Sequence, residues 1–286
     1  APPGTALLPV SLLVTSSLIA CSPSLPPTMS RVIWSLKDYI FLRQLYNSAV
    51  SQVYKCQCKY SKQYVVLKMY KDKYEKAINR HAIDREIDIN CRLDHHNIVR
   101  FYAAFEDSGY IVMVQEYKSC KNISQLLQLK ESGRVSEDMV RKGILPQVLD
   151  ALVYLHSHSI CHRDIKQENI LMCNDGVVKL CDFGVSIDLA RENASTHCGT
   201  ETCMAPEVKK CPLKSKWWQY KDRPELFYGL EVDIWSVGIL TYELLVGLTP
   251  CMISKKKNDW MPTFPEHLSD EAVGFIMSCL NRCSSL

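Results

Sequence analysis

The stretch Cys161-His162-Arg163-Asp164-Ile165-Lys166-Gln167-Glu168-Asn169, followed by Leu180-Cys181-Asp182-Phe183-Gly184, decides the fold. Between these two stretches, residues 170–172 and 177–180 are β-rich and flank Asn174-Asp175-Gly176, which is a strong hairpin-turn signal. A hairpin at this point would bring the two stretches together. The sequence therefore predicts that Asn169 and Asp182 lie side by side on two short loops.

The side chains on these loops match the needs of phosphoryl transfer. A protein catalyses that reaction mainly by positioning the nucleophile and by neutralising charge on the transferred group. Asp164 can accept the proton of a substrate hydroxyl while Lys166, on the same loop, faces the γ-phosphate. Asn169 and Asp182 supply the hard oxygen ligands that Mg²⁺ prefers. The residues together indicate magnesium-dependent phosphoryl transfer.

The two stretches resemble the catalytic loop and the metal loop of eukaryotic protein kinases, and more closely those of Aurora-like serine/threonine kinases. Lys166, two positions after Asp164, is typical of the serine/threonine branch. The resemblance runs from Leu45 to near Leu280. It implies a bilobal α+β kinase fold, with a small strand-rich N-lobe over residues 38–117 and a larger helical C-lobe over 118–286. It also implies ATP and Mg²⁺ as cofactors, and protein serine or threonine hydroxyls as substrates.

The resemblance extends to the residues that would hold the nucleotide. Tyr64-Val65-Val66-Leu67-Lys68 is a β-rich run that ends where the family carries its phosphate-binding lysine. Glu86 lies in a segment with an imperfect helical stripe, and we expect it to form an ion pair with Lys68. The other expected nucleotide contacts surround the adenine and the phosphates; they are Ser48, Ser51, Val53, Val66, Glu116, Lys118 and Leu171.

The hairpin that would cover the nucleotide departs from the family. Tyr46, Ser48 and Ser51 occupy the places of three glycines, which normally permit close backbone approach to phosphates. We expect weaker ATP binding as a result. The same substitutions favour an alternative function, a pseudokinase that keeps the fold as a scaffold. A small-molecule phosphotransferase of related fold is a further alternative, but the peptide-docking segment Gly199–Glu207 argues against it.

A regulatory site is implied by the resemblance in the segment after Asp182. Thr196 corresponds to the activating phosphothreonine of Aurora-type kinases, and a phosphate there can order a loop against cations. Arg163, His81 and Arg85 match the positions that receive this phosphate. An unmodified, solvated loop is the alternative interpretation of this segment.

Substrate recognition is implied less strongly. Thr200 matches the family residue that contacts the catalytic loop. Glu168 and Glu243 match acidic positions that pair with arginines in substrates of basic-directed kinases. Both glutamates can equally be surface charges or structural anchors. The expected partners are therefore protein substrates, with a slight preference for arginine-containing sites.

Composition fits one catalytic unit. The 286 residues are 47% hydrophobic and 23% charged, and the net charge of +3 gives no signal for nucleic-acid binding or stable membrane insertion. The fourteen cysteines are scattered, as in reduced intracellular proteins, which favours a cytoplasmic or nuclear location. Zinc binding is a minor alternative at Cys56-Gln57-Cys58 and at His156, His158, Cys161 and His162.

The first thirty residues differ in composition from the rest of the chain. Residues 1–30 carry no charged side chain, and the apolar run near Leu12–Cys21 resembles the middle of a signal peptide without its basic start. We expect residues 1–37 to form a low-complexity or disordered extension, with Met29 a plausible true start. Residues 38–286 would then be a kinase domain that is truncated at its C-terminus.

Overall fold

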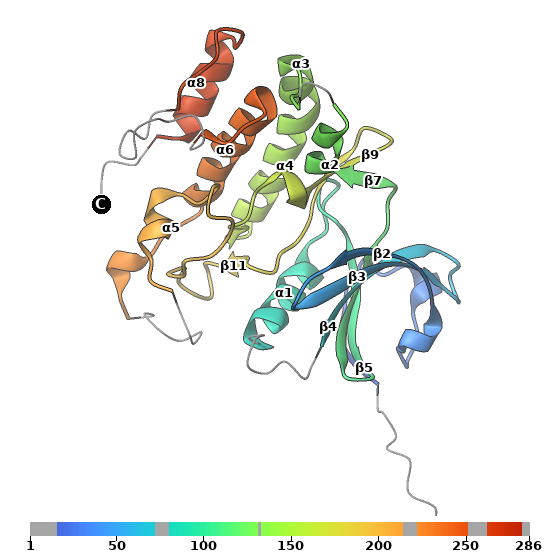
Figure 1. The fold of residues 1–286 in the computed structure, drawn as a ribbon. Helices are drawn as coiled ribbons and strands as arrows, with labels where there is room; N and C mark the ends of the chain where they lie inside the picture. Colours follow the sequence, from blue (N-terminus) through green and yellow to red (C-terminus); the bar gives the residue numbers. More distant parts are fainter. Residues whose placement is uncertain (1–15, 72–79, 131–132, 214–221, 251–261, 282–286) are drawn as a thin grey trace, which may run out of the picture.

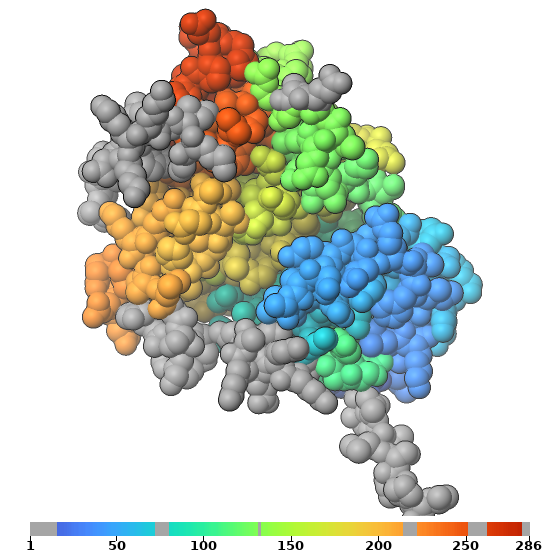
Figure 2. Space-filling view, viewed as in Figure 1, coloured from blue at the N-terminus to red at the C-terminus, as the bar shows by residue number. Residues whose placement is uncertain are grey.

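The computed structural model describes residues 16–71, 80–130, 133–213, 222–250 and 262–281. They form two lobes of different composition, one built mainly on a β-sheet and the other mainly on helices (Figure 1). In the space-filling view, the blue N-lobe meets the green and yellow segments of the C-lobe (Figure 2). The expected bilobal α+β architecture is confirmed.

The N-lobe contains a six-stranded antiparallel sheet with helix α1 (Arg80–Arg92) on one face. In spatial order the strands are β1 (Ser17–Cys21), β5 (Phe101–Asp107), β6 (Tyr110–Glu116), β4 (Tyr64–Lys71), β3 (Ser51–Cys58) and β2 (Tyr39–Asn47). Alternation along β4 sends Leu67 and Met69 to an apolar cluster with Trp34, and Tyr70 to a separate cluster with Ile83 of α1. Both faces of the sheet are therefore covered.

The segment before residue 38 differs from the expected disordered extension. Strand β1 pairs with β5, with Ser17 opposite Glu106 and Cys21 opposite Ala103. Two short 3₁₀ turns follow, η1 (Pro27–Met29) and η2 (Leu36–Asp38), and the Met29 side chain is buried. The expectation was wrong for residues 16–37, because β5 offers an edge of backbone donors and acceptors that an uncharged segment can join. Residues 1–15 lie outside the described part of the chain.

The C-lobe is built around a central helix, α6 (Glu231–Val246), which is buried on nearly all sides. The helices described in this lobe are α2 (Ile123–Gln128), α3 (Glu137–Met139), α4 (Leu145–Ser157), α5 (Pro206–Lys210), α6 (Glu231–Val246) and α8 (Asp270–Cys279). A π-helical turn, Val140–Ile144, separates α3 from α4. Pro146 falls in the first turn of α4, where its missing N–H costs no hydrogen bond. The π-helical turn therefore ends, and α4 begins, just before the proline.

The predicted hairpin between the two motif stretches is present. Strands β9 (Ile170–Cys173) and β10 (Val178–Leu180) pair around a turn whose Gly176 has a positive φ of 82°. Strand β7 (Cys120–Asn122) pairs with the other edge of β9. Strands β8 (Ile160–Cys161) and β11 (Ile187–Asp188) form a small sheet of their own, and two further 3₁₀ turns are η4 (Gln167–Asn169) and η5 (Pro224–Leu226).

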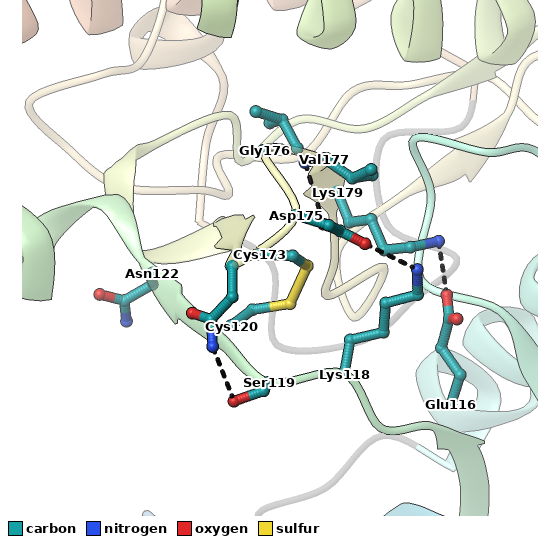
Figure 3. The surroundings of a disulfide bond; sticks show 12 residues. Glu116, Lys118, Ser119, Cys120, Asn122, Cys173, Asp175, Gly176, Val177 and Lys179 are labelled. Atoms are coloured by element: carbon teal, nitrogen blue, oxygen red, sulfur yellow. Dashed lines mark hydrogen bonds and ion pairs between the residues drawn. A yellow bond between two sulfur atoms is a disulfide. The ribbon is translucent and has the colours of Figure 1, made fainter.

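A disulfide bond joins β7 to β9. Cys120 lies directly opposite Cys173 in the antiparallel register, and their sulfur atoms are bonded (Figure 3). The expectation that the cysteines are reduced was therefore wrong for Cys120 and Cys173. The remaining cysteines of the described residues are free, Cys161, Cys181 and Cys279 among them.

The described residues contain no group of three or more His, Cys, Asp or Glu side chains placed to hold a metal ion, and this includes the two segments considered for zinc. No helix in the same part of the chain combines the length and the apolar character needed to cross a bilayer.

Candidate active site

Lys68, Glu86 and Asp182 meet between the lobes. The Lys68 ammonium lies 2.7 Å from Glu86 Oε1 and 2.7 Å from Asp182 Oδ1. The predicted Lys68–Glu86 ion pair is thus confirmed. Burial lowers the pKa of Lys68, but Glu86, Tyr70 and Asp182 outweigh it and raise that pKa well above its usual range. Lys68 in turn lowers the pKa of Asp182 to about 2, so the Asp182 carboxylate stays ionised at neutral pH.

The strand register explains why Lys68 faces this site. Val53 on β3 is paired with Lys68 on β4, and Val66 is two residues before it, so the three side chains share one face of the sheet. Val53 and Val66 are half-buried, as is Leu171 on β9 of the other lobe. The structure therefore places Val53 and Val66 on the face of the sheet that carries Lys68. The roles of Val53, Val66 and Leu171 in adenine binding stay predictions.

Asp164 is the centre of a compact network on the catalytic loop. The Asn169 amide donates to the Asp164 carbonyl at 2.9 Å and to its Oδ2 at 2.8 Å. Lys166 Nζ lies 2.8 Å from Asp164 Oδ2 and donates to Thr200 Oγ1 at 2.7 Å, while Thr200 donates to Asp164 Oδ1 at 2.7 Å. These four side chains hold one another in place without a ligand.

The two loops are fixed by a buried carboxylate and by unusual backbone conformations. Asp233 of α6 accepts from the His162 and Arg163 amides at 2.8 Å each, and lies 2.9 Å from His156 Nε2. Arg163 and Asp182 have φ values of 67° and 66°, a left-handed conformation that costs energy for residues other than glycine. The surrounding hydrogen bonds therefore maintain a strained backbone at both motif stretches.

The predicted magnesium ligands are adjacent. The Cys181 amide donates to the Asn169 carbonyl at 2.9 Å, which places Asp182 next to Asn169, as the hairpin predicted. Both amide hydrogens of Asn169 are directed at Asp164, so its amide oxygen is turned away from that residue. An ionised carboxylate and an amide oxygen are donors that suit Mg²⁺. The residues present thus fit this metal.

The segment that would face the adenine is tied to the other lobe. Glu116 Oε1 lies 2.7 Å from Lys179 Nζ of β10 (Figure 3). The Glu116 amide donates to the Arg100 carbonyl. The Glu116 N–H is therefore engaged, and its carbonyl remains the candidate for contact with the base. The Lys118 carbonyl accepts from Cys120, so the N–H of Lys118 is the second candidate.

The serines of the β2–β3 turn serve the turn itself. Ser48 Oγ accepts from the amides of Val50 at 3.3 Å and Ser51 at 3.0 Å, and the Ser48 amide donates to the Ser51 carbonyl. Tyr46 is 60% exposed. The Ser48 hydroxyl therefore stabilises the turn, and contact of Ser48 and Ser51 with phosphate stays a prediction.

The segment that carries Thr196 is docked against the catalytic loop. Arg163 donates to the Val185 carbonyl at 2.5 Å and to the Tyr228 hydroxyl at 3.0 Å, and that hydroxyl donates to the Thr196 carbonyl at 2.7 Å. Arg85 pairs with Glu192 at 3.2 Å, and burial and the nearby Arg163 lower the pKa of Arg85.

Two of the three predicted phosphate ligands, Arg163 and Arg85, lie near this segment, together with one residue that was not predicted. Arg163 and Arg85 are close to each other, and His81 is half-buried on α1. Tyr228 was not predicted from the sequence. A lone tyrosine before a helix carries no signal of its own, and its role depends on the bridge between Tyr228 and Ala194 that folding creates.

The two glutamates predicted to recognise arginine have different surroundings. Glu168 is exposed, whereas Glu243 of α6 is only 7% exposed and accepts from Gln167 Nε2 at 2.9 Å. Burial and the negative charge of Glu168 raise the pKa of Glu243 to about 7. Glu243 is therefore a structural carboxyl in this conformation, and Glu168 is the more accessible of the two.

Comparison with known proteins agrees with this site. The family model described as "Protein kinase domain" matches residues 39–286. The chain belongs to the protein kinase family. It is similar to an Aurora kinase from Patiria pectinifera, with 32% identity over 256 residues, which are 87% of this chain and 59% of that protein. It is also similar to serine/threonine-protein kinase PLK4 from Drosophila virilis, with 31% identity over 259 residues, 87% of this chain and 31% of that protein.

A third relative is serine/threonine-protein kinase 36 from Pongo abelii, with 36% identity over 216 residues, 75% of this chain and 15% of that protein. The chain thus covers about three fifths of the length of the Aurora relative and a small part of the length of serine/threonine-protein kinase 36. Protein kinases use ATP and Mg²⁺.

Proposed function

We propose that this chain is a serine/threonine protein kinase that transfers the γ-phosphate of ATP to hydroxyls of protein substrates. One observation carries the proposal. The Lys68–Glu86–Asp182 cluster adjoins the Asp164 network, and Asp182 is close enough to Lys166 to contribute to the raised pKa of that lysine. Nucleotide-binding and proton-accepting groups therefore occupy one continuous site.

Each side chain has a distinct task in this reaction. Asp164 accepts the proton of the substrate hydroxyl, and Lys166 and Thr200 hold the Asp164 carboxylate in place from two sides. Although burial lowers the pKa of Lys166, its bond to Asp164 raises that pKa overall, so Lys166 stays a cation that can face the transferred phosphate. Lys68 binds the α- and β-phosphates, and Glu86 orients it.

Asn169 and Asp182 are the residues that would hold magnesium. When bound, Mg²⁺ neutralises the charge of the phosphate oxygens. The low pKa of Asp182 keeps this ligand ionised without the metal, and the Asn169–Asp164 bonds orient the amide before any ligand arrives.

A pseudokinase scaffold is the second candidate, and the absence of glycines at Tyr46, Ser48 and Ser51 favours it. One assay separates the two. Wild type, Asp164→Asn and Asp182→Asn are each incubated with Mg-ATP and a generic basic protein, and nucleotide binding is measured in parallel. Labelling by wild type alone supports the kinase. Binding of Mg-ATP without labelling by any form supports the scaffold, and neither binding nor labelling refutes both.

Activation by phosphorylation of Thr196 belongs to the same proposal. Its support is that Arg163 and Arg85 lie near this segment. The Thr196→Ala variant is a clean test because Tyr228 contacts the Thr196 carbonyl, which the substitution retains. We expect strongly reduced activity in Thr196→Ala and near-normal activity in Thr196→Ser; full activity in Thr196→Ala removes the switch.

We extend the proposal to substrates and location. The substrates are intracellular proteins, cytoplasmic or nuclear, with a slight preference for arginine near the target hydroxyl. The exposed Glu168 carboxylate supports that preference through charge-assisted contacts. A peptide array compared between wild type and Glu168→Gln tests it, and equal use of peptides with and without arginine by the wild type contradicts it.

A further inference from the structure

The buried hydroxyl of Tyr70 provides a second hydrogen bond to Glu86. Tyr70 follows Lys68 by two residues on β4, so both side chains lie on the same face of the sheet. The Tyr70 hydroxyl donates to Glu86 Oε2 at 2.6 Å, while Lys68 Nζ forms an ion pair with Glu86 Oε1 at 2.7 Å. Each carboxylate oxygen of Glu86 therefore has its own donor, one neutral and one cationic.

The surroundings make this contact a strong one. Tyr70 is 7% exposed and Glu86 is 2% exposed, so water cannot readily replace the hydroxyl. The Tyr70 ring packs in one apolar cluster with Ile83 and Ile87 of α1. Burial and the charge of Glu86 raise the pKa of Tyr70 well above its usual range, which keeps the phenol a donor at neutral pH.

We propose that Tyr70 is a positioning residue that holds Glu86, and with it helix α1, in the orientation that pairs with Lys68. This inference rests on the proposed kinase function. Without the hydroxyl, one buried oxygen of Glu86 loses its hydrogen-bond donor. The carboxylate then lowers its free energy by turning toward water. Such a turn breaks the Lys68–Glu86 pair and leaves Lys68 with Asp182, a residue that the magnesium site also requires.

The first experiment does not depend on activity. Hydrogen exchange of the α1 amides, residues 80–92, is measured for wild type, Tyr70→Phe and Tyr242→Phe. The matched control Tyr242→Phe removes a buried hydroxyl bond of similar length, 2.7 Å to the Thr263 carbonyl, in the other lobe. A hydrogen bond to a charged group is worth roughly a tenfold change in an equilibrium, so we expect about tenfold faster exchange in α1 for Tyr70→Phe alone. Unchanged α1 exchange overturns the proposal.

The second experiment separates positioning through Glu86 from a general packing role. The dissociation constant of Mg-ATP and kcat/KM are measured for Tyr70→Phe in the wild-type and Glu86→Ala backgrounds, with thermal melts to verify folding. We expect Tyr70→Phe to reduce both nucleotide affinity and kcat/KM by about tenfold in wild type and by less than twofold in Glu86→Ala. Equal losses in both backgrounds overturn the proposal. If Glu86→Ala does not fold, Glu86→Gln replaces it, and Tyr70→Phe must then cost less than it does beside the ionised Glu86.

The two experiments also distinguish this inference from the proposed function. Faster α1 exchange in Tyr70→Phe, together with a wild type that binds Mg-ATP but labels no protein, supports the positioning role and refutes the kinase. An active wild type whose Tyr70→Phe variant retains full affinity, turnover and α1 protection supports the kinase and refutes the positioning role.

Discussion

Replacing Thr200 by valine tests the network around Asp164 without changing the size of the side chain. The Thr200 hydroxyl accepts from Lys166 and donates to Asp164, each at 2.7 Å. Both bonds involve a charged partner, and such bonds contribute about 1.5–3 kcal/mol each. Because the residue is only half-buried, water can take over part of this role. At about 1.5 kcal/mol for each bond, the loss of both bonds costs at most about 3 kcal/mol.

That loss corresponds to a decrease in kcat of up to roughly 150-fold, and about tenfold if water restores one bond. The assay is steady-state phosphorylation of a basic protein by wild type, Thr200→Val and the matched control Thr200→Ser, which keeps the hydroxyl. We expect the KM for ATP to change little, since Lys68 and Glu86 are untouched, and Thr200→Ser to retain most of the activity. A kcat of Thr200→Val within twofold of wild type refutes the idea that this hydroxyl orients Asp164 and Lys166.

Three other perturbations follow from the same structure. Tyr46→Gly should lower the KM for ATP, because glycine permits the backbone to approach the phosphates; an unchanged KM means that the hairpin does not limit binding. The pKa of Glu243 is raised to about 7 from 4.5, so its stabilising contribution is complete below pH 4.5 and is lost as the pH rises through 7. In urea titrations at pH 8, the free energy of unfolding of Glu243→Gln should therefore exceed that of wild type by about 3 kcal/mol, and the difference should vanish near pH 4.5. Reduction of the Cys120–Cys173 bond, which closes a separation of 53 residues, should lower the free energy of unfolding by about 2–4 kcal/mol, and a Cys173→Ser variant should show no response to reductant.

The parts of the site that could be predicted from the sequence are those set by local pattern. Asn169 and Asp182 are brought together by one short hairpin, so a turn signal between two β-rich runs was enough to place them. The β-rich run and the helical stripe placed Lys68 and Glu86 on a strand and a helix, but their pairing followed from the family resemblance. The Asp233 contact has no such local signal, because no short-range pattern joins α6 to the catalytic loop.

The parts that could not be predicted depend on pairing between distant segments. Strand β1 exists because β5 offers a free edge to an uncharged segment, a fact about the sheet that the composition of residues 17–21 cannot show. The disulfide depends on the register that sets Cys120 opposite Cys173, and one residue of slippage would turn the two side chains to different faces. The roles of the Tyr70 and Tyr228 hydroxyls likewise require the folded arrangement of β4, α1 and the segment before α6.

Two local features of this chain bear on how it would hold the phosphates of a nucleotide. At the β2–β3 turn, backbone freedom is replaced by side-chain hydrogen bonds from Ser48, which hold one turn geometry but bring no backbone amide closer to a phosphate. Phosphate binding must then depend more on Lys68. A second donor on Glu86, the Tyr70 hydroxyl, lowers the freedom of Glu86 and hence of Lys68. Orienting these groups before the nucleotide arrives reduces the entropy lost on binding, which offsets part of the weaker contact with the turn.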